Sequence, residues 1–319
     1  MKILPLLFLF ALFLLNGCEK KRNSLRPVIE NNTICASDGK LLRGTTLWHY
    51  RYGQLHHEEY YTLDPEYWLE NKKYGLNCFR LVCFDPWQKK RGFVSTSFEN
   101  EAQTEIFLSH LDSLVSLAKK LQMYLIINYH DVGNFDKQYH SKFWFVVAPR
   151  YAKEEFVLYE LFNEPVEWFP ADYSDDFLNY QEHIYSSVRK YAPETMLILF
   201  SFPNTSNKGK GRTMLDIVRL SKRIDWSNCV VGFHPYFTNY SSESISELKK
   251  NYPVFNTEQN IPSDGDVKPM DQQQWGVETM EELGIGWCAW SMNDVYNFKR
   301  NFVNGLLKDA EDKGYNWNN

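Results

Sequence analysis

The stretch that decides the fold is Val157-Leu158-Tyr159-Glu160-Leu161-Phe162-Asn163-Glu164-Pro165. The apolar run that opens it is typical of a strand buried on both faces of a parallel sheet. Proline cannot donate a backbone hydrogen bond, so this strand is predicted to stop at Pro165. Asn163 and Glu164 then lie at the carboxyl end of a buried strand, where parallel α/β folds hold their reactive residues.

A second stretch, Pro253-Val254-Phe255-Asn256-Thr257-Glu258, has the same character and also ends in a glutamate. A single polar strand end is as often structural as functional. Two strand-terminal glutamates suggest paired carboxylates, provided that the fold brings the two strand ends together.

The rest of the chain alternates strand-like and helix-like segments. Besides these two stretches, strands are expected at 42–48, 77–82, 124–129, 195–200, 229–234 and 285–290. Helices are expected at about 65–74, 101–121 and 275–283, and another passes through Trp144 and Tyr151. Two more are expected from their caps: one begins after an N-cap at Ser174, and a short one begins with a capping box of Ser244 and Glu247. Eight strands with helical spacers and no internal linker predict an α/β fold with a single (β/α)8 TIM barrel.

Length and charge narrow the possible functions. A chain of 319 residues suits one large domain, and a (β/α)8 barrel takes roughly 250. The net charge is −5 and no basic stripe occurs, so nucleic acid is not an expected partner. Aromatic residues make up 16% of the chain, a share high enough that some rings are expected to face a ligand.

The N-terminus has the pattern of an export signal. Lys2 precedes an apolar run over residues 4–15 that is too short to span a bilayer, which needs about 20 residues. Leu15-Asn16-Gly17-Cys18 then resembles the lipobox of bacterial lipoproteins. We therefore expect a lipoprotein signal peptide over 1–17, a lipidated tether over 18–27 and the barrel domain over 28–319.

Acyl chains on Cys18 would anchor the protein to a membrane of the bacterial cell envelope, at the outer membrane or the cell surface. The alternative is an ordinary signal peptide that happens to end near a cysteine. The other cysteines are Cys35, Cys78, Cys83, Cys229 and Cys288. They form no CxxC pair, so most are expected to be small buried core residues, with one disulfide left open. No metal and no cofactor are expected.

Polar and aromatic residues gather at the predicted strand ends. Arg80 lies within the second strand, and at or just past other strand ends lie His130, Asn163, Glu164, His234, Tyr236, Glu258 and Trp290. Any one of them has an ordinary structural explanation, such as a buried ion pair. Barrel closure, however, brings all strand ends to one mouth, where two facing glutamates among such side chains are best explained as a carbohydrate-cleaving site.

These motifs give the sequence a resemblance to glycoside hydrolase family 5, a family of retaining (β/α)8 glycosidases, from about Leu41 to Trp290. The matching motifs are Gly75-Leu76-Asn77-Cys78-Phe79-Arg80, Tyr159 to Pro165, His234-Pro235-Tyr236, Pro253 to Glu258, and Trp290. One departure is Gln259-Asn260, where the family often has an aromatic residue and a glycine.

The resemblance implies a double displacement between carboxyl groups about 5 to 5.5 Å apart. Glu258 is the expected nucleophile, kept ionised by Arg80, Tyr236 and His130. Glu164 is the expected general acid and then general base, because the negative charge of Glu258 favours its protonated form.

Other residues are expected to bind or support. Asn163 is expected to bind the sugar 2-hydroxyl, and Trp290 to stack beneath the sugar ring. Glu160 shares its side-chain direction with Phe162, points into the barrel and is expected to pair with a buried cation. Candidate walls of sugar subsites, each as easily a packing residue, are Trp48, His49, Trp87, Trp168 and Tyr240.

The implied substrate is a β-linked polysaccharide or oligosaccharide. We favour an endo-β-1,4-glucanase, with a β-mannanase or another β-glycan hydrolase of the family as the close alternative. A third hypothesis is a glycan-binding surface lipoprotein without catalysis. The complete charged set of Arg80, Glu164 and Glu258 argues against it, because a binding protein does not need all three.

Overall fold

The computed structural model describes residues 24–48, 62–73, 75–84, 98, 101–133, 135–206, 211–235, 241–260 and 277–290. Eight parallel strands form a closed barrel: β3 (Arg43–Trp48), β4 (Cys78–Phe84), β5 (Tyr124–His130), β6 (Val157–Glu160), β7 (Leu197–Phe202), β8 (Cys229–Phe233), β9 (Val254–Asn260) and β10 (Trp287–Trp290). Each pairs with the next along the chain, and β10 pairs with β3, which closes the barrel. The predicted (β/α)8 barrel is confirmed.

Alternation along each strand divides the side chains between the barrel interior and the surrounding helices. In β5, Ile127 and Tyr129 join the larger apolar cluster, which is shared with the helices. Ile126 joins a smaller cluster with residues of β4, β6, β7, β8, β9 and β10, so it lies inside the barrel. Asn128 and His130 continue this inward series towards the carboxyl end of the strand. The interior is therefore apolar where the strands begin and polar where they end.

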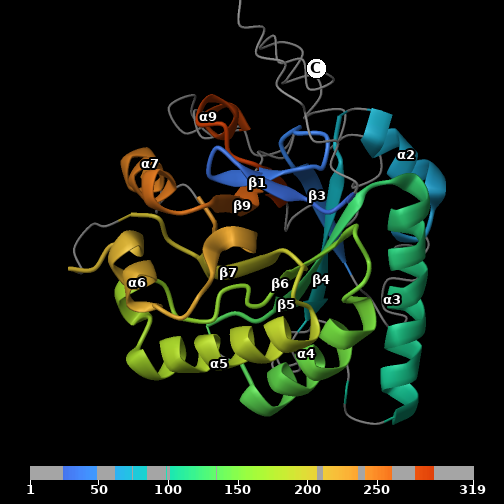
Figure 1. Ribbon diagram of the computed structural model, residues 1–319, viewed down its shortest axis with the longest axis horizontal. Coiled ribbons are helices and arrows are strands. Elements are labelled where there is room, and N and C mark those ends of the chain that lie inside the picture. The colour runs from blue at the N-terminus through green and yellow to red at the C-terminus, as the bar shows by residue number, and fades with distance from the viewer. Residues whose placement is uncertain are drawn as a thin grey trace, which may run out of the picture.

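The helices surround the barrel as an outer layer (Figure 1). They are α2 (Pro65–Lys73), α3 (Glu101–Leu121), α4 (Lys137–Tyr151), α5 (Asp175–Tyr191), α6 (Met214–Leu220), α7 (Ser242–Asn251) and α9 (Val277–Glu282), with short 3-10 turns η2 (Pro170–Asp172) and η3 (Trp226–Asn228). Each helix leads back to the start of the next strand. Their last turns therefore lie at the amino-terminal end of the barrel, opposite the polar mouth.

Helix caps agree with the sequence at one helix and differ at another. The Ser174 side chain accepts a hydrogen bond from the backbone nitrogen of Phe177 at the start of α5, as predicted. The predicted capping box of Ser244 and Glu247 is wrong. Ser241 is the N-cap of α7 and accepts from the backbone nitrogen of Ser244, which places Ser244 inside the helix. Neighbouring serines are equally good caps by residue type, so the sequence alone does not select among them.

A short hairpin that the sequence did not reveal closes the amino-terminal end of the barrel. β1 (Val28–Glu30) pairs antiparallel with β2 (Thr33–Cys35), and β2 joins β9 through Thr33 and Val254. Ile34 is fully buried in the interior cluster. Residues assigned to the tether also lie against this end, because the hydroxyl of Tyr124 donates to the carbonyl of Leu25 at 2.8 Å.

Several predictions concern residues outside the described part of the chain. These are the signal peptide over 1–17, the lipidation site Cys18, and the candidate site residues His49, Trp87, Tyr236 and Tyr240. They stay predictions.

Two further findings concern the described residues. None of the helices placed by the structure is both long enough and apolar enough to cross a bilayer. The cysteines other than Cys18 are all buried free thiols, which confirms that they are small core residues.

Candidate active site

Arg80 lies at the centre of a buried ionic network inside the barrel mouth. Its Nη1 donates to Oε1 of Glu258 at 2.7 Å, and its Nη2 donates to Oδ1 of Asn163 at 2.6 Å. Its Nε and Nη2 donate to the two oxygens of Glu160 at 2.5 and 2.9 Å. Burial opposes the guanidinium charge, but Glu160 and Glu258 outweigh it and raise the pKa of Arg80 above its usual value. The expected nucleophile therefore has a permanent positive charge beside it, as predicted.

Glu160 pairs with a buried cation, which confirms the role expected from its inward direction on β6. Its Oε1 also accepts a 2.9 Å hydrogen bond from the hydroxyl of Ser201. Ser201 reaches Glu160 at an irregularity of β7, where the register with β8 shifts between Leu199 and Phe202. Phe200 and Ser201 have φ angles of 72° and 43° there. Two successive non-glycine residues in the left-handed region are strained, and such strain is held where the surrounding structure requires it.

Asp131 fixes the position of the Asn163–Glu164 pair. Its Oδ1 accepts from the backbone nitrogen of Asn163 at 2.6 Å. Its carbonyl oxygen accepts from Nδ2 of Asn163 at 2.9 Å and from the backbone nitrogen of Glu164 at 3.1 Å. The Asn163 amide carries two N–H groups, and this contact uses one of them. The sequence analysis assigned no role to Asp131, although its position directly after β5 is a signal for one.

His234 lies between the two glutamates. Its Nδ1 is 2.7 Å from Oε1 of Glu164 and 3.6 Å from Oε2 of Glu258. Burial opposes the charged imidazole, but the charge of Glu258 and the hydrogen bond and charge of Glu164 outweigh it and raise the pKa of His234. One oxygen of each glutamate and a nitrogen of His234 all lie within 4.8 Å of one another. The carboxylates at the ends of the two decisive strands therefore meet, as predicted.

His130 and Trp290 form a stacked pair at the same mouth, with ring centroids 5.3 Å apart and planes 20° apart. The guanidinium carbon of Arg80 lies 5.9 Å from the Trp290 ring centroid. Burial, with the charges of Arg80 and His234, holds the pKa of His130 well below its usual value. A low pKa favours the neutral ring, so the part expected of His130 beside Glu258 is left to hydrogen bonding rather than to charge. Its ring also packs against the predicted sugar platform.

The neighbours of Glu258 on β9 hold its backbone in place. The Glu258 N–H donates to Oδ1 of Asn256 at 3.1 Å, and Nδ2 of Asn256 donates to Oε1 of Gln259 at 2.7 Å. Gln259 is fully buried and pairs with Ala289 of β10. The departure from the family pattern at Gln259 therefore continues the strand and supports the position of Glu258.

The structure brings seven predicted site residues to one mouth: Arg80, His130, Asn163, Glu164, His234, Glu258 and Trp290. Trp48 is the last residue of β3. Trp168 lies in the loop after β6 with 38% of its surface exposed, so it is available to a ligand. Ser201 and Asp131 are the supporting residues that sequence reasoning missed.

The two glutamates lie in different surroundings, which suits them to different chemical roles. The Glu258 side chain is 3% exposed and bound to Arg80, whereas the Glu164 side chain is 17% exposed and bound to His234. Glu164, His234 and Glu258 also have the residue types of a metal site. The guanidinium 2.7 Å from Glu258 opposes a cation there, because like charges repel.

Comparison with known proteins places this geometry in a family. Residues 54–295 match the family described as Cellulase (glycosyl hydrolase family 5). Endoglucanase E-5 of Thermobifida fusca is 25% identical over 207 residues, which cover 60% of this chain and 42% of that protein. An endoglucanase of Clostridium saccharobutylicum is 22% identical over 280 residues, which cover 83% of this chain and 56% of that protein. The chain thus spans about half the length of these curated relatives.

Solved structures share the fold. The catalytic domain of Thermobifida fusca endoglucanase Cel5A matches with a TM-score of 0.61 at 19% identity, covering 89% of this chain and 97% of that one. A mannohexaose complex of Thermomonospora fusca β-mannanase matches with a TM-score of 0.59 at 16% identity, covering 84% of each chain. Because the family match covers most of the chain and includes Arg80, Glu164 and Glu258, this protein belongs to the cellulase family, glycosyl hydrolase family 5.

Proposed function

We propose that the protein is a retaining glycoside hydrolase that cleaves β-glycosidic bonds in a polysaccharide. The observation that carries the proposal is the meeting of Glu164 and Glu258, with an oxygen of each within 4.8 Å. Retaining glycosidases hold their carboxyl groups about 5 to 5.5 Å apart, whereas inverting ones leave about 6.5 to 9.5 Å for a water molecule. The short separation supports attack on the sugar by a carboxylate.

Glu258 is the nucleophile in this proposal, because Arg80 binds it directly and favours its charged form. Glu164 is the more exposed of the pair, so it can protonate the departing sugar oxygen and then take a proton from the incoming water. The second N–H of the Asn163 amide is proposed to bind the sugar 2-hydroxyl. Trp290 is proposed as the flat ring beneath the sugar.

The proposed substrate is a β-1,4-glucan cut within the chain, since both curated relatives described above are named endoglucanases. Mannan is the second candidate, supported by the structural likeness to a β-mannanase in complex with mannohexaose. Both are uncharged β-linked polymers, so the same pair of glutamates serves either one.

A reducing-sugar assay over β-glucans, β-mannans and xylans tests the proposal, with viscosity measured to detect cuts within the chain. Glu258→Gln is the matched control, because it keeps the shape of the side chain but removes the nucleophilic charge. Faster cleavage of mannan than of glucan would select the mannanase alternative. No cleavage of any polymer, together with retained binding, would instead favour a glycan-binding protein.

We also propose that Cys18 carries acyl chains and anchors the protein to a membrane of the bacterial cell envelope. The apolar run over 4–15 and the sequence Leu15-Asn16-Gly17-Cys18 support this proposal. More than one acyl chain is needed for stable anchoring, which is what a modified lipoprotein cysteine carries.

A further inference from the structure

The end of the barrel opposite the active-site mouth carries exposed lysines from five separate segments. They are Lys120, Lys153, Lys190, Lys222 and Lys250, which we call the basic face. Each lies in or just after the last turn of a helix that returns to the start of a strand. Lysines in a last helical turn interact favourably with the helix dipole. Lys153 and Lys222 directly follow the C-caps of α4 and α6, Ala152 and Ser221.

Three acidic side chains at this end form ion pairs with cations outside the basic face. Glu154 pairs with Lys119 at 3.1 Å, Glu194 with Arg26 at 3.5 Å, and Glu281 with Arg43 at 2.7 Å. The first helical turns at the opposite end of the barrel carry Glu66, Glu101, Asp175, Asp176, Asp216 and Glu243. The described helices therefore have lysines in or just after several of their last turns and acidic residues in most of their first turns.

Apolar side chains are exposed at the same end as the lysines. Leu25, Tyr191 and Leu220 have 41%, 41% and 45% of their surface exposed. Aromatic and aliphatic side chains among lysines are typical of a surface that lies in the interface of a membrane.

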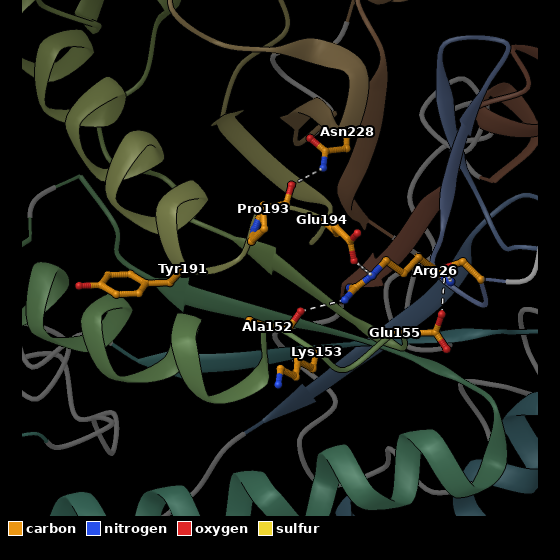
Figure 2. Close-up of a pocket in the computed structure, with 9 residues that line it drawn as sticks. Arg26, Ala152, Lys153, Glu155, Tyr191, Pro193, Glu194 and Asn228 are labelled. Carbon is orange, nitrogen blue, oxygen red and sulfur yellow. Dashed lines mark hydrogen bonds and ion pairs between the residues drawn. The ribbon is translucent and has the colours of Figure 1, made fainter.

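Ser24 and Arg26, at the N-terminal end of the described chain, bind to this end of the barrel. Figure 2 shows Arg26 reaching across a hollow of about 950 Å³ towards Ala152 and Glu194, with Lys153 at its edge. Nη2 of Arg26 donates to the carbonyl of Ala152 at 2.8 Å. The Ser24 hydroxyl donates to Glu155 at 2.9 Å. Cys18 is only six residues before Ser24, so the chain between them reaches at most about 20 Å.

We infer that the basic face lies against an anionic phospholipid bilayer and that the active-site mouth therefore points away from the membrane. The inference rests on the proposed lipidation of Cys18, not on the proposed hydrolase activity. Acyl chains at Cys18 would keep the face close to the bilayer surface, where each lysine is attracted to anionic headgroups. Ser24 and Arg26 bind at this end of the barrel, so the anchor lies beside the basic face, which favours one orientation.

Hydrogen–deuterium exchange of the acylated protein in vesicles tests this orientation. One vesicle is phosphatidylcholine alone, and the other is an equimolar mixture of phosphatidylcholine and phosphatidylglycerol. Acyl chains hold the protein on both, so the difference reports contact with the anionic headgroups. Exchange at 119–123, 151–155, 190–195 and 219–224 should be slower by about tenfold on the anionic vesicle. The difference should vanish in 1 M NaCl, where the Debye length is about 3 Å.

Two matched double variants complete the test. Lys153→Glu with Lys222→Glu should abolish the added protection. Lys137→Glu with Arg212→Glu changes the charge equally at the mouth end and should leave it intact. Equal exchange on both vesicles, or protection of the mouth end instead, overturns the inference.

Mass spectrometry of the purified protein reports acylation separately, and the polysaccharide assay reports activity. If mass spectrometry finds no acyl chains on Cys18, the proposed lipidation is wrong and the inference falls with it, whatever the activity assay shows.

Discussion

The hydroxyl of Ser201 donates a 2.9 Å hydrogen bond to Glu160, the carboxylate that binds Arg80. Glu160 binds Arg80 through both oxygens, and Arg80 binds Glu258 through its remaining terminal nitrogen. A residue of β7 is thereby connected to Glu258 of β9 through two intermediate residues. The chain of contacts is fully buried apart from Glu258, which is 2% exposed, so water cannot replace a missing partner easily.

Removing the Ser201 hydroxyl should weaken this chain of contacts. Ser201→Gly deletes the hydrogen bond and suits the φ of 43° at this position. Ser201→Ala deletes the same bond but keeps the strained backbone, so it should be the less stable variant. A hydrogen bond to a charged group contributes about 1.5 to 3 kcal/mol. Urea unfolding of the three proteins measures the loss, and an alanine variant as stable as wild type would contradict this account.

Gly232 offers a control on the same contact. A methyl group at Gly232 would lie 2.6 Å from Oγ of Ser201. Gly232→Ala should therefore displace the hydroxyl from Glu160. The loss of unfolding free energy caused by Gly232→Ala should be smaller in the Ser201→Gly background, because the Ser201 side chain that the new methyl group would meet is then absent. If the losses of unfolding free energy from the two substitutions were strictly additive, the two positions would be independent.

Removing the charge of Arg80 should move the acidic limb of the pH profile of kcat/KM to higher pH. In Arg80→Ala, Glu258 loses the positive neighbour at 2.7 Å, so it becomes protonated at a higher pH than in the wild type. The variant also leaves two buried carboxylates without their cation, which costs about 3 to 5 kcal/mol of stability.

Arg80→Lys is the matched control, since it keeps the charge but cannot bind both glutamates in the same fork. Its acidic limb should stay near that of the wild type while its kcat/KM falls. Circular dichroism must show that both variants are folded. An acidic limb that does not move in a folded Arg80→Ala protein removes Arg80 from this role.

His234 and His140 should affect stability with opposite dependence on pH. The pKa of His234 is raised in the folded protein, so its stabilisation is complete below its unfolded value and is lost as pH rises through the folded pKa. Burial lowers the pKa of His140 to about 3, so the wild type loses stability at this site as pH falls below the unfolded value. The measurement is the difference in unfolding free energy between wild type and His234→Gln or His140→Gln at several pH values. If this difference in unfolding free energy had the same slope against pH for His234→Gln as for His140→Gln, the assignment of charge to His234 would be contradicted.

The barrel strands were predictable because parallel strands that are buried on both faces consist of runs of apolar residues. The hairpin of β1 and β2 was not, because strands of three residues are too short to show a period of two. A turn signal was present in Asn31-Asn32, whose φ angles are 49° and 56°. Asparagine tolerates this left-handed region, which a tight hairpin turn requires. Helix α6 was missed although Thr213 and Asp216 form its capping box.

The site was predictable as far as residue direction along a strand determines it. Glu160, Asn163 and Glu164 follow from the position and end of one strand. Ser201 could not be placed, because it points at Glu160 only through the irregularity of β7, which leaves no mark in an apolar pattern. The lowered pKa of His130 could not be foreseen either, since it comes from burial and from the charges of Arg80 and His234 on other strands.

Replacing Cys18 by alanine should abolish lipid attachment. The acyl chains would have no thiol to carry them, so the protein should move from the detergent phase to the aqueous phase on phase separation. Cys35→Ala is a matched control, because Cys35 is buried at the end of β2 and its replacement should not change the partitioning. Partitioning of Cys18→Ala equal to that of the wild type would rule out the lipoprotein proposal.

The two glutamates can be assigned without relying on their rates. In Glu258→Gly the nucleophile is gone, and activity on natural substrate should fall to almost nothing. Azide can enter the vacated space on the face of the ring opposite the leaving group. With an activated aryl glycoside it should therefore give a glycosyl azide of inverted configuration, which proton NMR identifies.

Glu164→Gly should behave differently, because an activated aryl leaving group needs no proton. The variant should form the glycosyl-enzyme on Glu258 quickly and then stall without a base to activate water. Azide attacking that intermediate inverts the centre a second time, so its product keeps the original configuration. If Glu164→Gly gave the inverted azide and Glu258→Gly the retained one, the two roles would be exchanged. If neither variant gave an azide product while both remained folded, the close approach of Glu164 and Glu258 would not be the pair of a retaining glycosidase, since each half of that mechanism leaves one step that azide can complete.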